Sequence, residues 1–278
     1  MLRTMITAAN TMGQLQQNLD VVGNNLANSA THGYKAQHAS FQELMYQQYN
    51  NDKQDVAPRQ TADGIRYGVG AKMGQVQTNW KVGSLQNTER GLDFALTSPK
   101  QYFNVIMPTE NGEETVYTRQ GAFYVTPVAD NQVMLVNDDG NPIADENGMP
   151  IVFSDRVKDY HVKPGGVLQI VNEDDTIESI NLGISYIDRP NVMEHISGTY
   201  IGLPRNMEEL GIQPGEVVAN LQGGDRAQIG LENRMLEMSN VNYEKEMTDL
   251  MNVQRNYQFN SRAISIADQM LGLINGIR

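Results

Sequence analysis

The chain has 278 residues, of which 40% are hydrophobic, and a formal net charge of −12 at pH 7. This length allows one large domain, or two small ones with extensions, and a sizeable core. The acidic balance argues against nucleic-acid or anionic-membrane partners, because phosphate binding needs a basic face. There is no cysteine, no apolar run long enough to span a bilayer, and no N-terminal pattern typical of a cleaved secretory signal.

The negative charge is concentrated in the middle of the chain. Residues 46–234 hold 26 acidic and 15 basic residues, and therefore −11 of the −12. The first 34 residues and the last 23 are nearly uncharged and rich in Asn, Gln, Thr and Ser. A helix that faces water usually has a charged face. These ends therefore indicate helices packed among other helices, and the alternative is a pair of frayed ends.

Residues 1–45 are expected to form an N-terminal helix and a turn. Apolar residues recur at steps of three and four, with one irregular step between Met12 and Leu15. The stripe consists of Leu2, Met5, Ala9, Met12, Leu15, Leu19, Val22 and Leu26. Residues Asn28, Ser29 and Thr31 to Gly33 favour caps and turns, and predict the end of the helix.

The middle of the chain is expected to hold a β domain between two connecting segments. Residues 46–75 are polar and lack helical or strand periodicity, which predicts an extended linker. Short β-type segments separated by turns predict a compact antiparallel β domain over 76–205, with a hairpin at Asn111-Gly112. Residues 206–234, which include five glycines, are expected to be a connector to the last helix.

Residues 235–278 are expected to form a C-terminal coiled-coil helix. Its apolar stripe keeps steps of three and four without a break, and Asn260 is its one polar member. The stripe consists of Leu250, Val253, Tyr257, Asn260, Ile264, Ala267, Leu271 and Ile274. Residues 239–242 offer helix caps. Because each terminal helix is marginal alone, we expect an α+β fold in which the two helices form an antiparallel coiled coil.

No residue pattern predicts catalysis or a bound cofactor. The histidines at 32, 38, 161 and 195 lack metal-ligand spacing. The acidic stretches near 137–141 and 145–148 fail the calcium-loop frame, and two hairpin turns explain them better. Neither a nucleotide loop nor a hydrolase triad is recognisable. We expect no enzymatic activity, cofactor, metal or small-molecule substrate.

Three sequence blocks resemble the bacterial flagellar rod and hook proteins. The first has the signature residues Asn24, Asn25, Leu26, Ala27, Asn28, Thr31, Gly33, Tyr34 and Lys35. A central block, 117–123, resembles the β-domain motif of the family and contains Arg119, Gly121 and Phe123. The third block comprises residues 236–242, Glu246-Met247 and residues 254–261. The blocks occur in the family order and span nearly the whole chain.

Within this family the chain is most similar to distal rod proteins. It departs from common family residues at Arg234-Met235 and at Gln101. These departures bear on the subtype and leave the resemblance to the family intact. The resemblance implies a structural subunit of the flagellar basal body. Such a subunit is exported through the flagellar type III apparatus without a cleaved signal peptide. It then assembles with copies of itself and with related rod and hook proteins into a helical, torque-transmitting tube.

Three kinds of protein are alternatives to a rod subunit. A subunit of the rod–hook junction, or a hook-type axial protein, differs from a rod subunit in position only. A coiled-coil adhesin outside the cell would be favoured by a conventional secretion signal. A wall-cutting hydrolase would need a pair of carboxylates or a zinc-type cluster in a cleft.

Overall fold

A computed structural model describes residues 2–43, 47–49, 65–67, 71–109, 112–129, 131–204, 207, 211 and 213–276. The chain divides into two compact units. The helical unit consists of Met1–Ala27, Gln37–Gln77 and Asn242–Arg278, and the β unit of Asn28–Ala36 and Thr78–Val241. The fold is α+β, with helices at both ends of the chain and a β-rich centre, as the sequence predicts.

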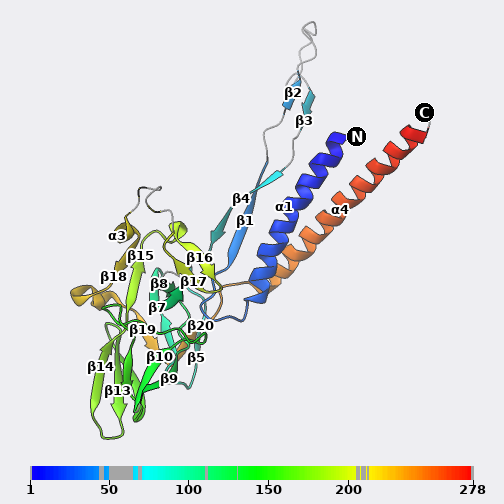
Figure 1. The fold of residues 1–278 in the computed structure, drawn as a ribbon. Coiled ribbons are helices and arrows are strands. Elements are labelled where there is room, and N and C mark those ends of the chain that lie inside the picture. Colours follow the sequence, from blue (N-terminus) through cyan, green and yellow to red (C-terminus); the bar gives the residue numbers. More distant parts are fainter. Residues whose placement is uncertain are drawn as a thin grey trace. The chain divides into compact units, whose positions relative to one another are not determined.

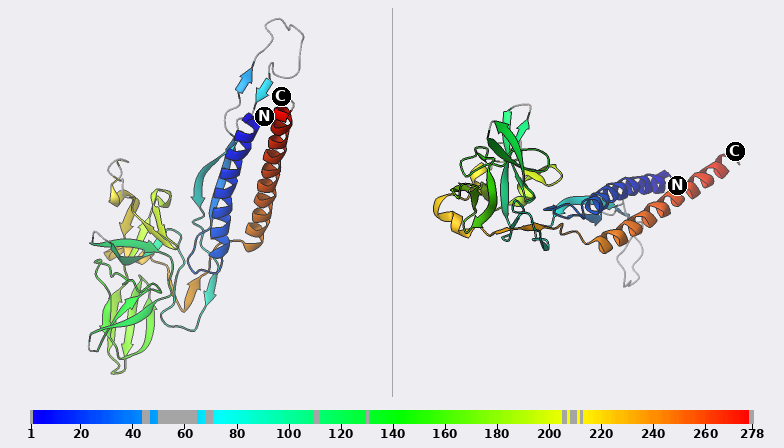
Figure 2. Two further views of the ribbon diagram at one scale, coloured as in Figure 1. Left: turned by 45° about the vertical axis from the view of Figure 1, so that its right-hand side comes forward. Right: turned by 90° about the horizontal axis from the view of Figure 1, so that it is seen from below.

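Two long helices form the helical unit. Helices α1 (Leu2–Ala27) and α4 (Tyr243–Gly276) pack against each other. They run in opposite directions, so the N- and C-termini lie at the same end of the pair (Figure 1), and the helices stay side by side in the turned views of Figure 2. Within the described residues, no helix has the apolar length that a membrane span requires.

Strands accompany the helices in this unit. Strand β1 (Gln37–Glu43) pairs with β4 (Ala71–Thr78) and packs against α1, and β2 (Gln47–Tyr49) pairs with β3 (Ile65–Tyr67). The stretch 46–75, expected to be an extended linker, therefore contains paired strands, while residues 50–64 lie outside the described part. Sequence pattern missed β2 and β3 because each has only three residues, which is too short to show alternation.

The start of α4 agrees with the sequence. The Asn242 side-chain oxygen accepts a hydrogen bond from the backbone N–H of Lys245 (3.0 Å), which is an N-terminal helix cap. The cap comes from the predicted segment 239–242. The acidic residues Glu244 and Glu246 lie in the first turn, where they interact favourably with the positive end of the helix dipole.

The β unit contains one large sheet and several small ones. The six-stranded sheet has the order β16-β17-β8-β7-β15-β18. Its strands are β16 (Glu194–Ser197), β17 (Tyr200–Gly202), β8 (Gly112–Thr118), β7 (Gln101–Thr109), β15 (Ile184–Ile187) and β18 (Val218–Asn220). In the antiparallel pair β7–β8, Thr109 lies opposite Gly112, which confirms the predicted hairpin.

Two three-stranded sheets and two short pairs complete the unit. The first sheet has the order β11 (Val152–Ser154), β10 (Gln132–Val136) and β9 (Tyr124–Ala129). The second consists of β12 (Val157–Lys163), β13 (Val167–Asn172) and β14 (Ile177–Asn181). The short pairs are β19 (Leu231–Asn233) with β6 (Phe94–Leu96), and β20 (Met235–Glu237) with β5 (Leu85–Asn87).

The stretch 206–234, expected to be a connector, contributes to the β unit in its described part. It holds α3 (Pro214–Val217), the edge strand β18, the 3-10 helix η2 (Gly223–Gln228) and β19. A further 3-10 helix, η1, covers Pro190–Val192. The strands in this stretch are only three residues long. Such a length shows no alternation that a sequence pattern could reveal.

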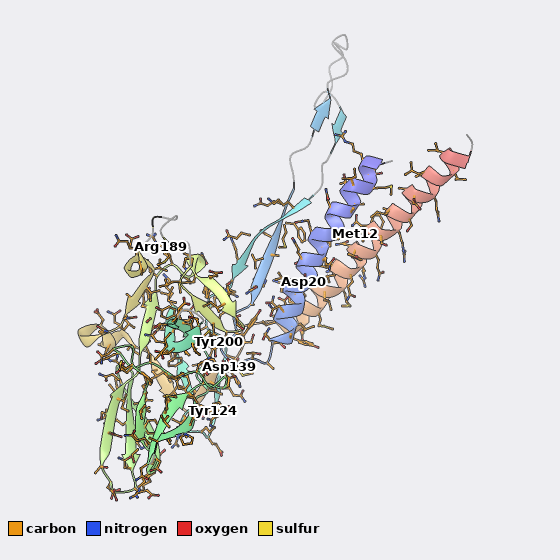
Figure 3. All side chains as sticks on the ribbon, viewed as in Figure 1. Met12, Asp20, Tyr124, Asp139, Arg189 and Tyr200 are labelled. Carbon is orange, nitrogen blue, oxygen red and sulfur yellow. The ribbon has the colours of Figure 1, made fainter. Side chains whose placement is uncertain are left out.

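The β unit contains two buried apolar clusters. The larger one includes four phenylalanines, of which Phe103 and Phe123 lie edge to face at 5.1 Å between ring centroids. The Tyr200 hydroxyl donates a 2.5 Å hydrogen bond to Asp139, so β17 is tied to the turn after β10 (Figure 3). The fully buried apolar side chains include Phe94, Phe103, Phe123, Leu135, Ile143, Leu168, Ile170, Leu182 and Ile184.

Candidate assembly site

Most positions of the predicted helix seam are buried or half-buried on both terminal helices. On α1, Leu15 and Val22 are buried and Leu19 is half-buried. On α4, Val253 is buried, whereas Ile274 at the end is 56% exposed. The half-buried members on α4 are Leu250, Tyr257, Asn260, Ile264 and Leu271.

The seam of α1 differs from the prediction at one position. Ala9 is exposed, and its neighbour Ala8 is half-buried. With Ala8 in the stripe, the positions from Met5 to Leu26 follow regular steps of three and four, and the irregular step at Met12 to Leu15 disappears. Two adjacent alanines are equally apolar, so only the helix register chooses between them.

A second, polar face of α1 contacts the strands of the helical unit. The Gln14 side chain accepts a hydrogen bond from the backbone N–H of Met73 (2.7 Å). Asn25, which is fully buried, donates to the Gln37 carbonyl (2.7 Å) and accepts from the Gln37 N–H (2.9 Å). This signature residue therefore fixes the start of β1 against the end of α1. The uncharged polar side chains are thus used in packing within the unit.

The rest of the N-terminal motif lies at the end of α1 and in the β unit. In the turn that follows, the Thr31 hydroxyl donates to the Asn28 side chain (3.2 Å). Gly33 has φ +72°, and a Cβ there would lie 2.6 Å from the Arg119 carbonyl carbon, so this position requires glycine. Of the remaining motif residues, Asn24 and Ala27 are exposed, Leu26 is half-buried, and Tyr34 and Lys35 are buried.

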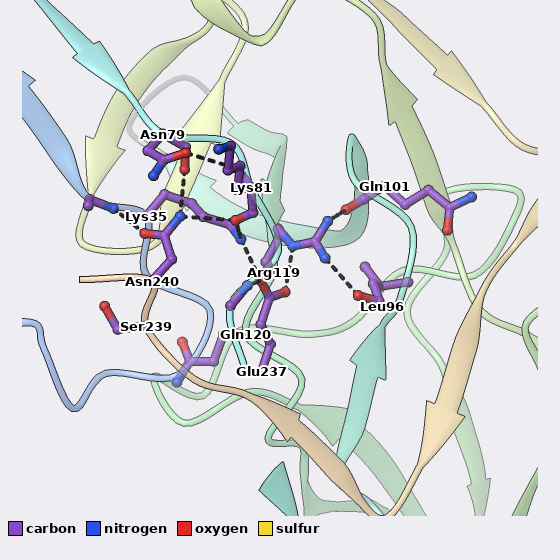
Figure 4. Close-up of polar contacts among 12 residues, drawn as sticks. Lys35, Asn79, Lys81, Leu96, Gln101, Arg119, Gln120, Glu237, Ser239 and Asn240 are labelled. Carbon is purple, nitrogen blue, oxygen red and sulfur yellow. Dashed lines mark hydrogen bonds and ion pairs between the residues drawn. The ribbon is translucent and has the colours of Figure 1, made fainter. Parts of the chain in front are cut away.

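Lys35, Arg119 and Glu237 form a buried charged triad in the β unit (Figure 4). The Arg119 Nε donates to Glu237 Oε2 at 2.7 Å, and Lys35 Nζ donates to Glu237 Oε1. Lys35 is 6% exposed, Arg119 2% and Glu237 1%. The Glu237 carboxylate, which belongs to the third block, thus binds Lys35 from the first block and Arg119 from the central block.

Backbone groups complete the coordination of the triad. The Arg119 guanidinium donates to the carbonyls of Leu96 (2.7 Å), Ser98 (3.0 Å) and Gln101 (2.9 Å). Glu237 also accepts from the Gly83 N–H (2.8 Å). Buried charges are costly unless they are paired and hydrogen-bonded. The triad is therefore a constraint that fixes how the N-terminal motif, the central motif and β20 associate.

An asparagine next to the triad joins the same segments. Asn240 accepts a hydrogen bond from the Ala36 N–H (2.7 Å) and donates to the carbonyls of Asn79 (2.7 Å) and Lys81 (2.9 Å). The Lys81 carbonyl also accepts from Lys35 Nζ (2.7 Å). Residues 35 and 36 are therefore bonded both to Asn240, just before α4, and to the segment that contains Lys81.

The other central-motif residues are core elements. The Gly121 carbonyl accepts a hydrogen bond from the Phe94 N–H (2.9 Å), and Phe123 is completely buried.

Sequence reasoning did not select Glu237, Asn240 or Gly83. Glu237 and Asn240 lie within the third block, and an acidic residue between Leu236 and Met238 was the available signal.

In the acidic turns near 137–148, side chains accept hydrogen bonds from backbone N–H groups of the same turn. The Asn137 side chain accepts from the Asn141 N–H (2.8 Å), and Asp145 accepts from the N–H groups of Asn147 and Met149 (both 2.8 Å). This confirms that they are turns. Across the described ranges, no group of three His, Cys, Asp or Glu side chains is placed to hold a metal ion.

Burial lowers the pKa of the Lys35 ammonium from 10.5 to about 8, although Glu237 opposes this shift. Between these values the unfolded chain binds more protons at Lys35 than the folded chain does. The free energy of unfolding therefore rises with pH in this window. We expect the difference between the original chain and Lys35→Met to grow by about 2 kcal/mol from pH 8 to pH 10. Urea unfolding at fixed pH values measures it, and a constant difference would contradict it.

Comparison with known proteins agrees with the placement of the three blocks. Residues 5–35 match the family described as Flagella basal body rod protein. Residues 99–170 match Flagellar hook protein FlgE/F/G D1 domain, and residues 232–277 match Flagellar basal body rod FlgEFG protein C-terminal. The three matches contain Lys35, Arg119 and Glu237, respectively.

Two full-length relatives come from Bacillus subtilis. The chain is 40% identical to its Flagellar hook-basal body complex protein FlhP over 100% of both chains. It is 29% identical to the Flagellar basal-body rod protein FlgG of the same organism, over 98% of this chain and 97% of that one. FlgG of Borreliella burgdorferi is 29% identical over 100% and 99%. The chain belongs to the family of flagellar basal-body rod and hook proteins.

Proposed function

We propose that this protein is a structural subunit of the flagellar rod, which assembles through its terminal helices into a helical tube that transmits torque. Membership of a family of flagellar rod and hook proteins supports this function. The subunit acts by rigid assembly and catalyses no reaction. Its partners are copies of itself and related rod and hook proteins.

An exposed apolar stripe on α4 is the observation that carries this proposal. It lies on the side of the helix that is turned away from the seam, and its members recur at helical spacing. Phe259 is 73% exposed and Leu273 is 69% exposed. The stripe consists of Met251, Phe259, Ile266, Met270 and Leu273. Exposed apolar patches of this kind mark interaction sites, because burying them on a neighbour is favourable.

We propose that the helix pair is an antiparallel coiled coil and the building block of the tube. The heptad spacing of both seams supports this geometry. Asn260 lies on the seam and donates to the Asn256 carbonyl of its own helix (2.9 Å). If the stripe of one copy packs against another surface of the next copy, the contact is heterologous, and a rotation that does not close generates a helical tube.

Export through the flagellar type III apparatus, without a cleaved signal peptide, is part of this proposal. A chain that passes a narrow channel unfolded benefits from having no disulfides, and this chain has no cysteine. Terminal helices that are marginal alone would order only after assembly. The resulting location is the basal body of the bacterial flagellum.

A rod–hook junction or hook-type axial subunit is the second candidate function. The specific observation that favours it is the 40% identity to a relative named as a hook-basal body complex protein. The same terminal helices and the same stripe would serve either position. The two functions differ in which neighbours the subunit contacts.

Deletion of the gene tests the proposed function. We expect paralysed cells whose rods stop short and carry no hooks, because later axial subunits lack a platform. Electron microscopy of isolated basal bodies measures this. Complete rods that lack only the hook would favour the second candidate. Normal motility with complete basal bodies would contradict both functions and favour the adhesin.

The exposed stripe gives a sharper prediction. We expect the double substitution Phe259→Ser and Leu273→Ser to abolish motility while it leaves the stability of the monomer nearly unchanged, because both side chains are exposed. Swimming assays and urea unfolding measure the two effects. Ile177→Ser is the matched control, since Ile177 is 62% exposed on β14, outside the stripe. Full motility of the double variant would contradict a role of the stripe in assembly.

A further inference from the structure

A groove in the helical unit lies between α1, β1 and the start of α4. All of its lining residues belong to this unit. Its volume is about 300 Å³, which is at the small end of the range for binding pockets, so it fits a side chain and not a whole helix or strand. Its apolar lining residues are Val21, Val22, Ala39, Phe41 and Val253.

Glu246 is a nearly buried carboxylate in this groove. The residue is only 3% exposed, and its carboxylate has no hydrogen bond or ion pair with any residue that the structure describes. Because Glu246 lines the groove, the little surface that it retains opens there. Its place in the first turn of α4 offsets part of the cost of burial. The remaining cost is relieved only when a donor or a cation reaches the carboxylate.

The groove carries more negative than positive charge. Asp249, three residues after Glu246 on the same helix, adds a second, half-buried carboxylate. The basic lining residues are Lys245, which is exposed so that water solvates its ammonium, and His38, which is exposed and counted as neutral at pH 7. Two carboxylates therefore face one solvated ammonium, and the groove favours a further cation that also has an apolar stem.

The exposed stripe of α4 contains two such cations. Arg255 and Arg262 each lie three or four residues from two members of the stripe, and this spacing places them on the same face of the helix. Both are exposed, and neither has an acidic partner in the described part of the chain. A guanidinium has a planar set of donors that binds carboxylates and stacks on aromatic rings. The stripe thus complements the groove in charge and in apolar character.

The arginines of a chain point away from its own groove. Val253 belongs to both the seam and the lining of the groove, so the groove lies on the seam side of α4, whereas the stripe is turned away from the seam. We propose that the groove receives a stripe arginine of a second copy of this chain, with the guanidinium at Glu246 and Asp249 and the stem against Phe41.

This contact would connect copies into a continuous array. The inference rests on the proposed function, because it names the surface that the stripe meets in the tube. Groove and stripe are different surfaces of one subunit, so the contact is heterologous and repeats from copy to copy. Phe41 is 42% exposed in the single chain and would be covered by the incoming side chain.

A reversal of charge on both surfaces tests the contact in cells. The groove variant combines Glu246→Gln with Asp249→Lys, and the stripe variant combines Arg255→Glu with Arg262→Glu. Each variant alone should lose motility. The chain that carries all four substitutions should swim again, because every groove then meets a stripe of opposite charge. The stripe variant combined with Asp268→Lys, which changes an exposed acidic residue of α4 outside the groove, should stay non-motile.

The absence of cysteine from the chain allows a direct test of proximity. Asn252 lines the groove, and Gln258 lies three and four residues from the two stripe arginines. With both replaced by cysteine, oxidation of isolated basal bodies should yield a ladder of covalent oligomers, since each copy carries both halves of the contact. Ile177→Cys in place of Asn252→Cys is the control and should give no ladder, because Ile177 lies on β14.

The outcomes separate this contact from the rod function. Motile groove or stripe variants, or assembled basal bodies without a ladder, would overturn the contact, and short rods in the deletion strain would still support the rod function. A four-substitution chain that does not swim and gives no ladder with the cysteine pair would also overturn it. A cross-link to a different protein would assign the groove to another axial subunit instead of a second copy. Complete basal bodies in the deletion strain would remove both proposals.

Discussion

Replacement of Glu237 by glutamine is expected to lower the free energy of unfolding by about 3–5 kcal/mol. The carboxylate accepts hydrogen bonds from Lys35, Arg119 and the Gly83 N–H, and its side chain is fully buried. Glutamine has nearly the same shape, but it is neutral and places an N–H₂ group toward a cation. Two buried cations would then face each other without a counterion, which costs far more than the lost hydrogen bonds alone.

Urea unfolding followed by Trp80 fluorescence measures this effect in the β unit. Glu232→Gln is the matched control, because it makes the same chemical change at an exposed position on β19. It should change the free energy of unfolding by less than about 0.5 kcal/mol.

A double variant separates the electrostatic cause from a packing defect. Adding Lys35→Met to Glu237→Gln removes one of the orphaned cations. The double variant should therefore be more stable than the sum of the two single effects predicts. Strict additivity, or a Glu237→Gln variant as stable as the control, would contradict the electrostatic role of Glu237.

The helical part of this fold could be predicted because its signal is local. The spacing of apolar residues predicts α1 and α4, and the cap at Asn242 predicts where α4 begins. The hairpin of β7 and β8 follows in the same way from one Asn-Gly step. Where a signal was ambiguous the prediction failed, as with Ala8 and Ala9, since both residues are equally apolar.

The triad could not be predicted, because its members are distant in sequence. Arg119 and Glu237 are 118 positions apart, and Lys35 and Glu237 are 202 positions apart. Lys35 and Arg119 were chosen by resemblance to a family motif, and Glu237 was not chosen at all. The one local signal, an acidic residue between Leu236 and Met238, does not say which cations the carboxylate meets. That depends on β20 pairing with β5, which places the carboxylate beside Gly83.

The strands β3, β4, β18 and β19 were missed for a related physical reason. Three of them have only three residues and β4 is largely polar, so they are held by backbone pairing with strands that form elsewhere. Secondary structure of this kind is a consequence of the tertiary fold. A sequence pattern detects only the strands whose own side chains alternate between core and solvent.

The second large effect is expected for Gly121→Ala, which should lower the free energy of unfolding by about 3 kcal/mol or more. A Cβ at this position would lie 1.8 Å from the Phe94 carbonyl oxygen and 2.8 Å from its carbon. Both atoms belong to the backbone of β6, so no side-chain rotation can relieve the overlap. Phe103 is also close, at 3.3 Å, and closes the remaining direction.

The displacement forced by this methyl group would extend beyond its own contact. Strand β6 also carries the Leu96 carbonyl that accepts from Arg119, and the Phe94 N–H donates to the Gly121 carbonyl. Moving β6 therefore weakens both the core and the triad. Gly224→Ala is the control, because a Cβ there meets no atom within 4 Å, and it should be neutral or slightly stabilising. Equal urea midpoints for the two variants would show that β6 yields without cost, and Gly121 would then be dispensable for the fold.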